Sequence, residues 1–276
     1  MKLFNKVAIV GVGLIGGSLG LALKKKGLCE RIIGVASHKK SIELAKRKRA
    51  IDSGSLNIDI IKDADLIILA TPVNTILTLA PKIKKLVKKD AVVIDVGSTK
   101  EQISSRLSRI FENYIGCHPL AGSEKRGIKN ASWDLFVNSL CIITPTKKTG
   151  NHAKAKIVNL WKQIGTKIIF ITPAEHDRIL SFISHLPHII AFSLISSVPD
   201  DLLRFASGGL RDTTRIAGSE ALLWRDIFLS NRKNLLKSIQ QFENKLKGLK
   251  LVIQNKNAPA LEKILKAAKS KREQLK

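Results

Sequence analysis

A histidine follows a strand-like apolar run and precedes a proline in the stretch GCHPLAG, near the middle of the 276-residue chain. An imidazole in such a place has two uses. It can be a buried side chain with a bonded partner, or it can accept and return a proton near neutral pH. Cys117 raises the question of a thiol nucleophile, but adjacent residues on a strand point to opposite faces. We therefore expect Cys117 to be a small buried hydrophobe and treat His118 as the candidate for chemistry.

A second stretch, GVGLIG, can hold a phosphate, because it follows an apolar run directly and opens a helix-like run. Its glycines Gly11, Gly13 and Gly16 match the GxGxxG spacing of dinucleotide sites. The first permits a tight turn, the second lets a pyrophosphate approach the backbone, and the third allows close packing of helix on strand. The N–H groups at the helix start, around Leu14 and Ile15, would then face the negative charge. We predict a dinucleotide site at this turn.

The segment after the second apolar run bears on the choice between NAD and NADP. An NAD site usually presents an Asp or Glu there to the ribose hydroxyls, but the chain reads GVASHKKS, without a carboxylate. Ser37, His38 and Lys39 offer donors and positive charge, which suit a 2′-phosphate. We therefore predict NADP in preference to NAD. Thr71 and Pro72, at the end of the next apolar run, are expected to line the same cofactor.

These residues lie on a chain that alternates between strand-like and helix-like segments up to about residue 172. The strand candidates are residues 7–12, 31–36, 66–71, 91–96, 114–117, 141–145 and 167–172. Most are rich in Val and Ile without alternation, which is typical of strands covered on both faces. The βαβα order predicts an α/β fold with a doubly wound, mostly parallel, Rossmann-like dinucleotide-binding sheet.

From Pro173 the pattern changes to long helical stretches without a strand between them. We therefore predict two domains, a dinucleotide-binding domain at residues 1–172 and an all-helical substrate and dimerisation domain at residues 173–276. In a monomeric domain of about 100 residues, apolar faces such as ALLWRDIFL would remain exposed to solvent. We expect a homodimer that forms through the helical domain.

The composition excludes some classes of function. The net charge is +26, from 48 Lys and Arg against 22 Asp and Glu. Such a balance raises nucleic-acid binding, yet the lysines are spread along segments that read as amphipathic helices. Aromatic residues make up only 5% of the chain, which gives little sign of a platform for stacking bases. We expect a solvated basic surface that attracts anionic ligands and no nucleic-acid partner.

Cysteine usage and hydropathy narrow the class further. The three cysteines form no CxxC pair or Cys/His cluster, which argues against a zinc site, and their odd number argues against a disulfide framework. We find no apolar run long enough to cross a bilayer, which takes about 20 residues, and no signal-peptide core at the start of the chain. We therefore expect a cytoplasmic protein with no membrane partner and no bound metal.

Further motifs follow in a fixed order along the chain: DVGSTK at 95–100, GCHPLAG, SHLPH at 184–188, GGLRDTTRIA at 208–217 and LWRDIF at 223–228. Together with the glycine turn they resemble the prephenate/arogenate dehydrogenase family, and the resemblance covers essentially the whole chain. It implies a dinucleotide-fold domain, a helical domain that dimerises, and oxidative decarboxylation of a cyclohexadienol to a phenol with NAD or NADP. No segment like a chorismate mutase precedes the first strand, so we expect no fused regulatory domain.

The resemblance gives roles to two catalytic candidates. His118 matches the family's catalytic histidine, whose neutral imidazole accepts the proton of the ring hydroxyl while hydride leaves for the nicotinamide. Ser98, in the GST turn, matches the serine that bonds the same hydroxyl. A turn or helix N-cap would also explain Ser98, and one hydroxyl can serve both uses.

Candidate substrate residues also match family positions, because prephenate is a dianion and needs cationic partners. Arg215 matches the arginine that binds a substrate carboxylate with a forked geometry that lysine lacks. Arg211, one helical turn earlier, either shares that charge or forms a surface salt bridge. Ser123 and Glu124 match residues at the pocket mouth, although Glu124 would equally suit a solvated loop.

SHLPH and LWRDIF supply the remaining candidates. His188 matches the position that contacts the substrate side chain, and its presence favours prephenate over arogenate. His185 and His188 are three residues apart, as metal ligands can be, but no third ligand converges on them, so we expect no metal. Trp224 lines the pocket or the dimer seam, or is a plain core residue.

The function that these features predict is oxidation of prephenate to 4-hydroxyphenylpyruvate in tyrosine biosynthesis. A close alternative is an arogenate dehydrogenase, which performs the same chemistry on a substrate with an amino group. A third is another member of the 3-hydroxyacid dehydrogenase group, but the lysine that this group places on a second-domain helix has no counterpart here. An alternative from another class is a basic nucleotide-sensing or nucleic-acid-binding protein with a dinucleotide fold. Such a protein would bind DNA or RNA with an affinity that depends on salt.

Overall fold

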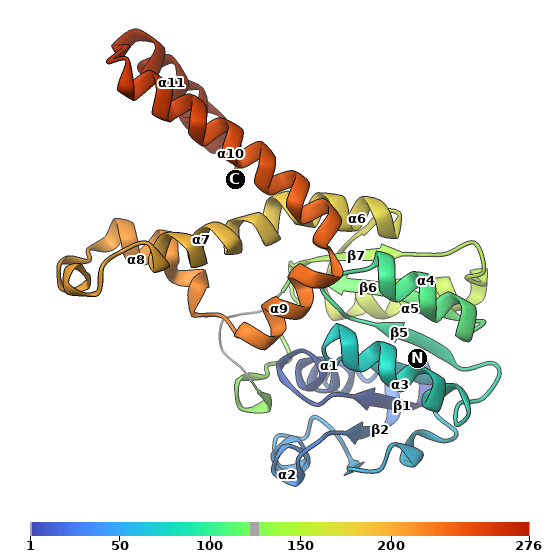
Figure 1. Cartoon of the computed structure of the whole chain (residues 1–276). Helices are drawn as coiled ribbons and strands as arrows, with labels where there is room; N and C mark the ends of the chain where they lie inside the picture. Colours follow the sequence, from blue (N-terminus) through green and yellow to red (C-terminus); the bar gives the residue numbers. More distant parts are fainter. Residues whose placement is uncertain (1, 122–126, 276) are drawn as a thin grey trace. The chain divides into compact units, whose positions relative to one another are not determined.

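The computed structural model describes residues 2–121 and 127–275. It groups into two compact units, Met1–Asn231 and Arg232–Lys276 (Figure 1). The first unit is built on a single sheet of eight strands in the order β3-β2-β1-β4-β5-β6-β7-β8. The strands are β1 (Phe4–Val10), β2 (Cys29–Val35), β3 (Ser53–Ser55), β4 (Leu66–Leu69), β5 (Val92–Asp95), β6 (Tyr114–Pro119), β7 (Leu140–Thr144) and β8 (Lys167–Phe170).

The pairing confirms the predicted doubly wound, mostly parallel sheet. β6 and β7 run antiparallel, and the other neighbouring strands run parallel. Each predicted strand is present. β3 was missed because its three residues, Ser-Gly-Ser, carry no apolar signal. The order reverses between β1 and β4, so the carboxyl ends of these two strands are where a dinucleotide is expected to bind.

Helices cover both faces of the sheet (Figure 1). One face carries α1 (Leu14–Lys25), α2 (Lys39–Arg47) and α5 (Asn151–Ile164), and the other carries α3 (Val73–Lys84) and α4 (Glu101–Ile110). Along β1, Val7 and Ile9 belong to the first core, whereas Ala8 and Val10 belong to the second. Both faces of the central strand are therefore apolar, which explains why its sequence does not alternate. Short 3-10 turns are η1 (Ile58–Ile61) and η2 (Ile128–Asn130).

After β8 the described elements are helical, as expected. They are α6 (Pro173–Leu180), η3 (Ser181–His185), α7 (Leu186–Ser196), η4 (Asp200–Phe205), α8 (Gly208–Thr214), η5 (Arg215–Gly218) and α9 (Ala221–Ser230). The Thr172 side chain caps α6 by accepting from the Glu175 N–H, and a proline occupies its first turn. The segment η3 is a π-helical turn that joins α6 to α7 without a break.

The continuous helix Pro173–Ser196 corrects one expectation. By length and composition alone this helix is long and apolar enough to cross a membrane. Of its most apolar 18-residue segment, 22% is buried inside the protein. The expectation that no run reaches that length was therefore wrong. Its first turns nevertheless carry His176 and Asp177, which are buried at 0% and 1% exposure. Their hydrogen bonds are described with the site below.

The second unit is a pair of helices, α10 (Arg232–Gln254) and α11 (Ala258–Glu273). The Asn257 side chain caps α11 by accepting from the Ala260 N–H at 3.1 Å. Helix α9 ends at Ser230 and α10 begins at Arg232, so Asn231 separates the two helices. The predicted domain boundary at residue 172 stays a prediction, since the compact units divide at Asn231 instead.

Candidate active site

The glycine turn joins β1 to α1 at the carboxyl edge of the sheet. Gly11 has φ +104°, and a Cβ there would lie 2.5 Å from the Ala70 carbonyl oxygen. A Cβ on Gly16 would overlap the Gly11 carbonyl oxygen, whereas a Cβ on Gly13 would meet no atom within 4 Å. No side chain caps the first turn of α1, so its N–H groups around Leu14 and Ile15 are available to an anion. These residues fit a dinucleotide pyrophosphate.

The neighbouring strand ends agree with that assignment. The Thr71 hydroxyl, just after β4, is buried and has no hydrogen-bond partner among the described residues. A buried hydroxyl left so costs about 1–3 kcal/mol, which a cofactor bonded to it would relieve. Pro72 is exposed and immediately precedes α3, at its N-cap position. Ser37, His38 and Lys39 are exposed after β2.

The catalytic candidate His118 lies near the end of β6 and is half-buried. Its ring Nδ1 is 2.8 Å from Nε2 of His176, which comes from α6. Nδ1 of His176 is in turn 2.7 Å from Oδ1 of Asp177. Two imidazoles and a carboxylate therefore form one hydrogen-bonded series, of which the sequence predicts only the first member.

The Asp177 carboxylate is fixed by the start of α4. It accepts hydrogen bonds from the backbone N–H of Lys100 at 2.7 Å and of Glu101 at 2.9 Å. Such N–H groups have no partner inside the helix, so Asp177 acts as the cap of α4. Asn231 donates to the Asp177 backbone oxygen at 2.7 Å and lies 3.1 Å from Nδ1 of His185. The break between α9 and α10 thus places a residue in this network.

A buried charge pair lies beside the histidines. The Lys100 ammonium pairs with Asp95, and both side chains are fully buried. Asp95 also accepts from the Tyr114 hydroxyl at 2.6 Å. Burial, His176, the positive charge of Lys100 and His185 together hold the pKa of His118 well below its usual range. His118 is therefore a neutral imidazole at neutral pH.

The pKa of His176 is also lowered, mainly by burial, although its hydrogen bond to Asp177 opposes the shift.

Burial raises the pKa of the Cys117 thiol to about 12. Cys117 is fully buried and behaves as the small hydrophobe that the sequence predicts, because a thiol with that pKa is a poor nucleophile.

Ser98 lies half-buried in the turn after β5, the strand that neighbours β6. The helix that follows is capped by Asp177, so the N-cap alternative for Ser98 is not what the structure shows. The next residue, Thr99, contacts Ser230 of α9 at 3.0 Å between hydroxyl oxygens. The hydroxyl of Ser98 makes no hydrogen bond to another described residue.

Some of the substrate candidates come together around Trp224. The His188 ring stacks on the Trp224 ring at 3.5 Å between centroids, with 23° between planes. The pKa of His188 is lowered by burial and, in part, by the positive charge of Arg215, so that cation lies within electrostatic reach. The His185 ring meets Trp224 edge-on at 6.1 Å. Arg211 is exposed on α8, and no described contact joins it to this group.

Two of the predicted substrate residues, Ser123 and Glu124, lie outside the described residues. The described residues contain no group of three side chains arranged to hold a metal ion. His185 and His188 have separate partners, because Nδ1 of His188 lies 2.9 Å from the Ser184 carbonyl oxygen.

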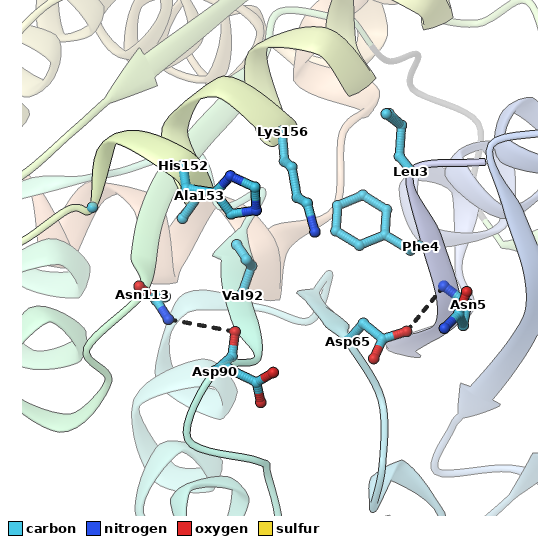
Figure 2. A pocket seen from close by; sticks show the side chains of 11 residues that line it. Leu3, Phe4, Asn5, Asp65, Asp90, Val92, Asn113, His152, Ala153 and Lys156 are labelled. Atoms are coloured by element: carbon cyan, nitrogen blue, oxygen red, sulfur yellow. Dashed lines mark hydrogen bonds between the residues drawn. The ribbon is translucent and has the colours of Figure 1, made fainter. Parts of the chain in front are cut away.

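A separate hollow lies at the opposite, amino-terminal edge of the sheet (Figure 2). It is lined by the start of β1 and by polar residues that include Asp65, Asp90, His152 and Lys156. Part of its polar lining is already engaged, since Asp65 accepts from the Asn5 N–H at 2.9 Å. We place the candidate active site at the carboxyl edge, where the histidines and the glycine turn lie.

Comparison with known proteins identifies the family to which the chain belongs. A family profile described as "Prephenate dehydrogenase, nucleotide-binding domain" matches residues 19–170, and "Prephenate dehydrogenase, dimerization domain" matches residues 172–267. A prephenate dehydrogenase of Bacillus subtilis is 34% identical over 98% of this chain and 76% of its own length. A cyclohexadienyl dehydrogenase of Zymomonas mobilis is 34% identical over 100% of this chain and 98% of its own length.

A solved structure is also closely similar. It is a prephenate dehydrogenase from Aquifex aeolicus in complex with hydroxyphenyl propionate and NAD+. The TM-score is 0.94 at 36% identity, over 99% of this chain and 98% of the other. With both domain profiles matched in order and relatives above 30% identity along nearly the whole length, this chain belongs to the prephenate dehydrogenase family of nicotinamide-dependent oxidoreductases.

Proposed function

We propose that the chain oxidises prephenate to 4-hydroxyphenylpyruvate and carbon dioxide, with NAD(P)+ as the hydride acceptor, in tyrosine biosynthesis. One observation carries the proposal. His118 is a neutral, half-buried imidazole at the carboxyl edge of the sheet, and one of its ring nitrogens is held by His176 at 2.8 Å. No described residue bonds the other nitrogen, Nε2, which leaves it for a substrate hydroxyl. The names of the similar proteins support the same reaction.

His118 accepts and later returns the proton that the reaction transfers. The nicotinamide, when bound, supplies the acceptor for the hydride that leaves the hydroxyl-bearing ring carbon. Nε2 of His118 takes the hydroxyl proton as positive character grows at that carbon. The bond to the ring carboxylate breaks, carbon dioxide departs, and its electron pair completes the aromatic ring. His118 then returns the proton to the oxygen, which gives a phenol.

The surroundings of His118 suit that role. A base must be unprotonated before the reaction, and burial together with Lys100 keeps the pKa of His118 low. Ser98, in the turn beside it, is proposed to bond the same hydroxyl. Arg215 is proposed to hold a substrate carboxylate, with Arg211 sharing the charge and the net charge of +26 attracting the dianion. Ser123 and Glu124 are proposed to stand at the entrance.

A second candidate substrate is arogenate, which the tautomer of His188 supports, although the presence of His188 alone was expected to favour prephenate. The Ser184 carbonyl can only accept, so Nδ1 of His188 carries the hydrogen and Nε2 is an acceptor. With its pKa lowered by burial, this ring can accept a hydrogen bond at Nε2 from the ammonium of arogenate, and it carries no hydrogen there for the ketone of prephenate. Trp224, stacked on it, is proposed to wall the same side of the pocket.

For the cofactor we propose NADP in preference to NAD. Ser37, His38 and Lys39 follow β2 where an NAD site usually has a carboxylate. Calorimetric titration of the free protein with NADP+ and with NAD+ gives the two affinities and decides the preference. Tighter NAD+ binding would defeat this part of the proposal.

We also propose a cytoplasmic homodimer that forms through the helical region. Large apolar side chains on its helices are exposed, among them Phe182, Ile183, Leu222 and Leu229 at 37%, 61%, 61% and 63%. Exposed apolar surface of this kind marks an interface, and it accounts for the apolar character of the helix Pro173–Ser196. Light scattering after size exclusion tests the mass, and a monomer at micromolar concentration would contradict the proposal.

The activity itself is tested with a matrix of two substrates and two cofactors. Prephenate or arogenate is mixed with NAD+ or NADP+, and the reduced nicotinamide is followed by its absorbance. We expect turnover with prephenate. Turnover with arogenate alone would replace the first substrate by the second, and no turnover in any of the four mixtures would refute the proposed function.

A further inference from the structure

The hydrogen bonds behind His118 have a direction, because the last acceptor in the series is a carboxylate. An ionised carboxylate only accepts, so Nδ1 of His176, 2.7 Å from Asp177, must carry the hydrogen. The neutral His176 ring then has its lone pair on Nε2. This nitrogen lies 2.8 Å from Nδ1 of His118, so Nδ1 of His118 must be the donor. The lone pair of neutral His118 is thereby left on Nε2.

We propose that Asp177 and His176 are positioning residues that hold His118 in the tautomer with hydrogen on Nδ1, so that Nε2 is the proton acceptor. A neutral histidine in water prefers the opposite tautomer, with hydrogen on Nε2, in which the outer nitrogen cannot accept a proton. The identity of the group that gives up the proton rests on the proposed function. The tautomer itself does not.

The position of Asp177 makes the direction firm. Oδ1 accepts both the His176 ring N–H and the Lys100 backbone N–H, at 2.7 Å each, and Oδ2 accepts the Glu101 N–H at 2.9 Å. Each of these roles needs an oxygen that accepts. The start of α4 also favours negative charge. Asp177 therefore cannot become a hydrogen-bond donor to His176, which would reverse the direction of the hydrogen bonds, without losing its role as the cap of α4.

His176 is placed to act through His118 and not on a ligand. Its side chain is fully buried, and both ring nitrogens are engaged inside the protein. His118, by contrast, is half-buried and keeps one nitrogen available. A purely structural role for His176 would be to fill space between α6 and β6, and such a role predicts no effect on the tautomer of His118.

The test reads the tautomer directly. The protein is labelled with 15N-histidine, and long-range 1H–15N spectra at pH 7.5 distinguish protonated from unprotonated ring nitrogens. The His118 signals are assigned by their loss in His118→Asn. We expect hydrogen on Nδ1 and a lone pair on Nε2 in the wild type without substrate. Hydrogen on Nε2 of wild-type His118 would overturn the proposal.

Variants of His176 then connect the tautomer to turnover. His176→Leu removes the acceptor, so the His118 tautomer should shift and kcat should fall by about 10²–10⁴-fold, the scale of a wrong tautomer in a catalytic histidine. KM should change by less than about threefold, because no ligand contact is lost. His176→Gln puts an amide oxygen where it can accept from His118, and should recover at least about tenfold of the lost kcat.

A matched control weakens α6 without touching the two rings. Thr172→Ala removes the cap of that helix, which should lower the urea midpoint of unfolding, while the His118 tautomer stays unchanged and kcat stays within about twofold of wild type. If His176→Leu also stayed within threefold, the proposal would fail. If His176→Leu did not fold, the wild-type spectrum and His176→Gln would still decide. An inactive wild type would refute the proposed function, and the spectrum would still decide the tautomer.

Discussion

The two edges of the sheet use the same kinds of side chain in opposite ways. At the carboxyl edge, Asp95 and Lys100 form an ion pair in which both side chains are fully buried. At the amino edge, Asp65 and Lys88 lie 3.5 Å apart with side chains 32% and 41% exposed. Both are pairs of a lysine and an aspartate at strand ends. Only the first lies beside histidines whose pKa values are shifted.

The difference shows what burial does to a charged pair. An exposed pair gains little attraction, because water and salt screen it. A buried pair loses its hydration and holds only if the partners stay together, and its field acts strongly on its neighbours. The carboxyl edge keeps this costly arrangement where the proposed base must stay neutral. The amino edge, with its hollow in Figure 2, has no comparable buried pair among the described residues.

The largest expected effect is on catalysis at the carboxyl edge. His118→Asn should lower kcat by about 10³-fold or more, because it removes the proton acceptor, while the affinity for NAD(P)+ should stay within about twofold. Initial rates and nucleotide titration by calorimetry measure the two quantities. Turnover within tenfold of wild type would mean that another group takes the proton.

The next effect compares the two ion pairs directly. Lys100→Met leaves Asp95 buried without its cation, and should lower the free energy of unfolding by about 3–5 kcal/mol. Lys88→Met at the amino edge should lower it by less than about 1 kcal/mol. Urea unfolding of both variants gives the two values. Equal losses would show that burial does not separate the edges.

A third effect concerns stability against pH. The pKa values of His118, His176 and His185 are lowered in the folded chain, chiefly by burial, and that of His185 falls to about 4. Between about 4 and the unfolded value of 6.5, the unfolded chain binds more protons than the folded one. Stability should therefore be full above pH 6.5 and decline by a few kcal/mol as the pH falls toward 4.

Urea midpoints at several pH values measure that slope, and His118→Asn should make it shallower because one shifted group is removed. A slope that is unchanged in this variant would show that His118 does not titrate as the structure implies. A stability that rises as the pH falls would contradict the sign itself.

The sequence predicts the parts of this site that depend on local pattern. The glycine turn, seven of the strands and His118 were found because glycine spacing, Val- and Ile-rich runs and a short motif are all local signals. β3 was missed because three small residues give no such signal.

His176 and Asp177 were missed for a different reason. His176 lies 58 positions after His118, and only the packing of α6 against the sheet brings them together. The burial of Lys100 could not be predicted from the sequence either, since a lysine in a glycine-containing turn is ordinarily exposed to solvent. The dipeptide His-Asp in the first turn of a helix was the one available signal, and it carries no information on its partner.

The smallest effect is expected at the hollow of the amino edge. Asp90 is exposed there, and its backbone oxygen, not its side chain, accepts from Asn113 at 3.4 Å. Asp90→Asn should change the free energy of unfolding by less than about 0.5 kcal/mol and leave kcat and KM unchanged. Denaturant unfolding and initial rates check both. A clear loss of turnover would mean that the amino edge communicates with the histidines, and burial alone would then no longer explain why chemistry is confined to one edge.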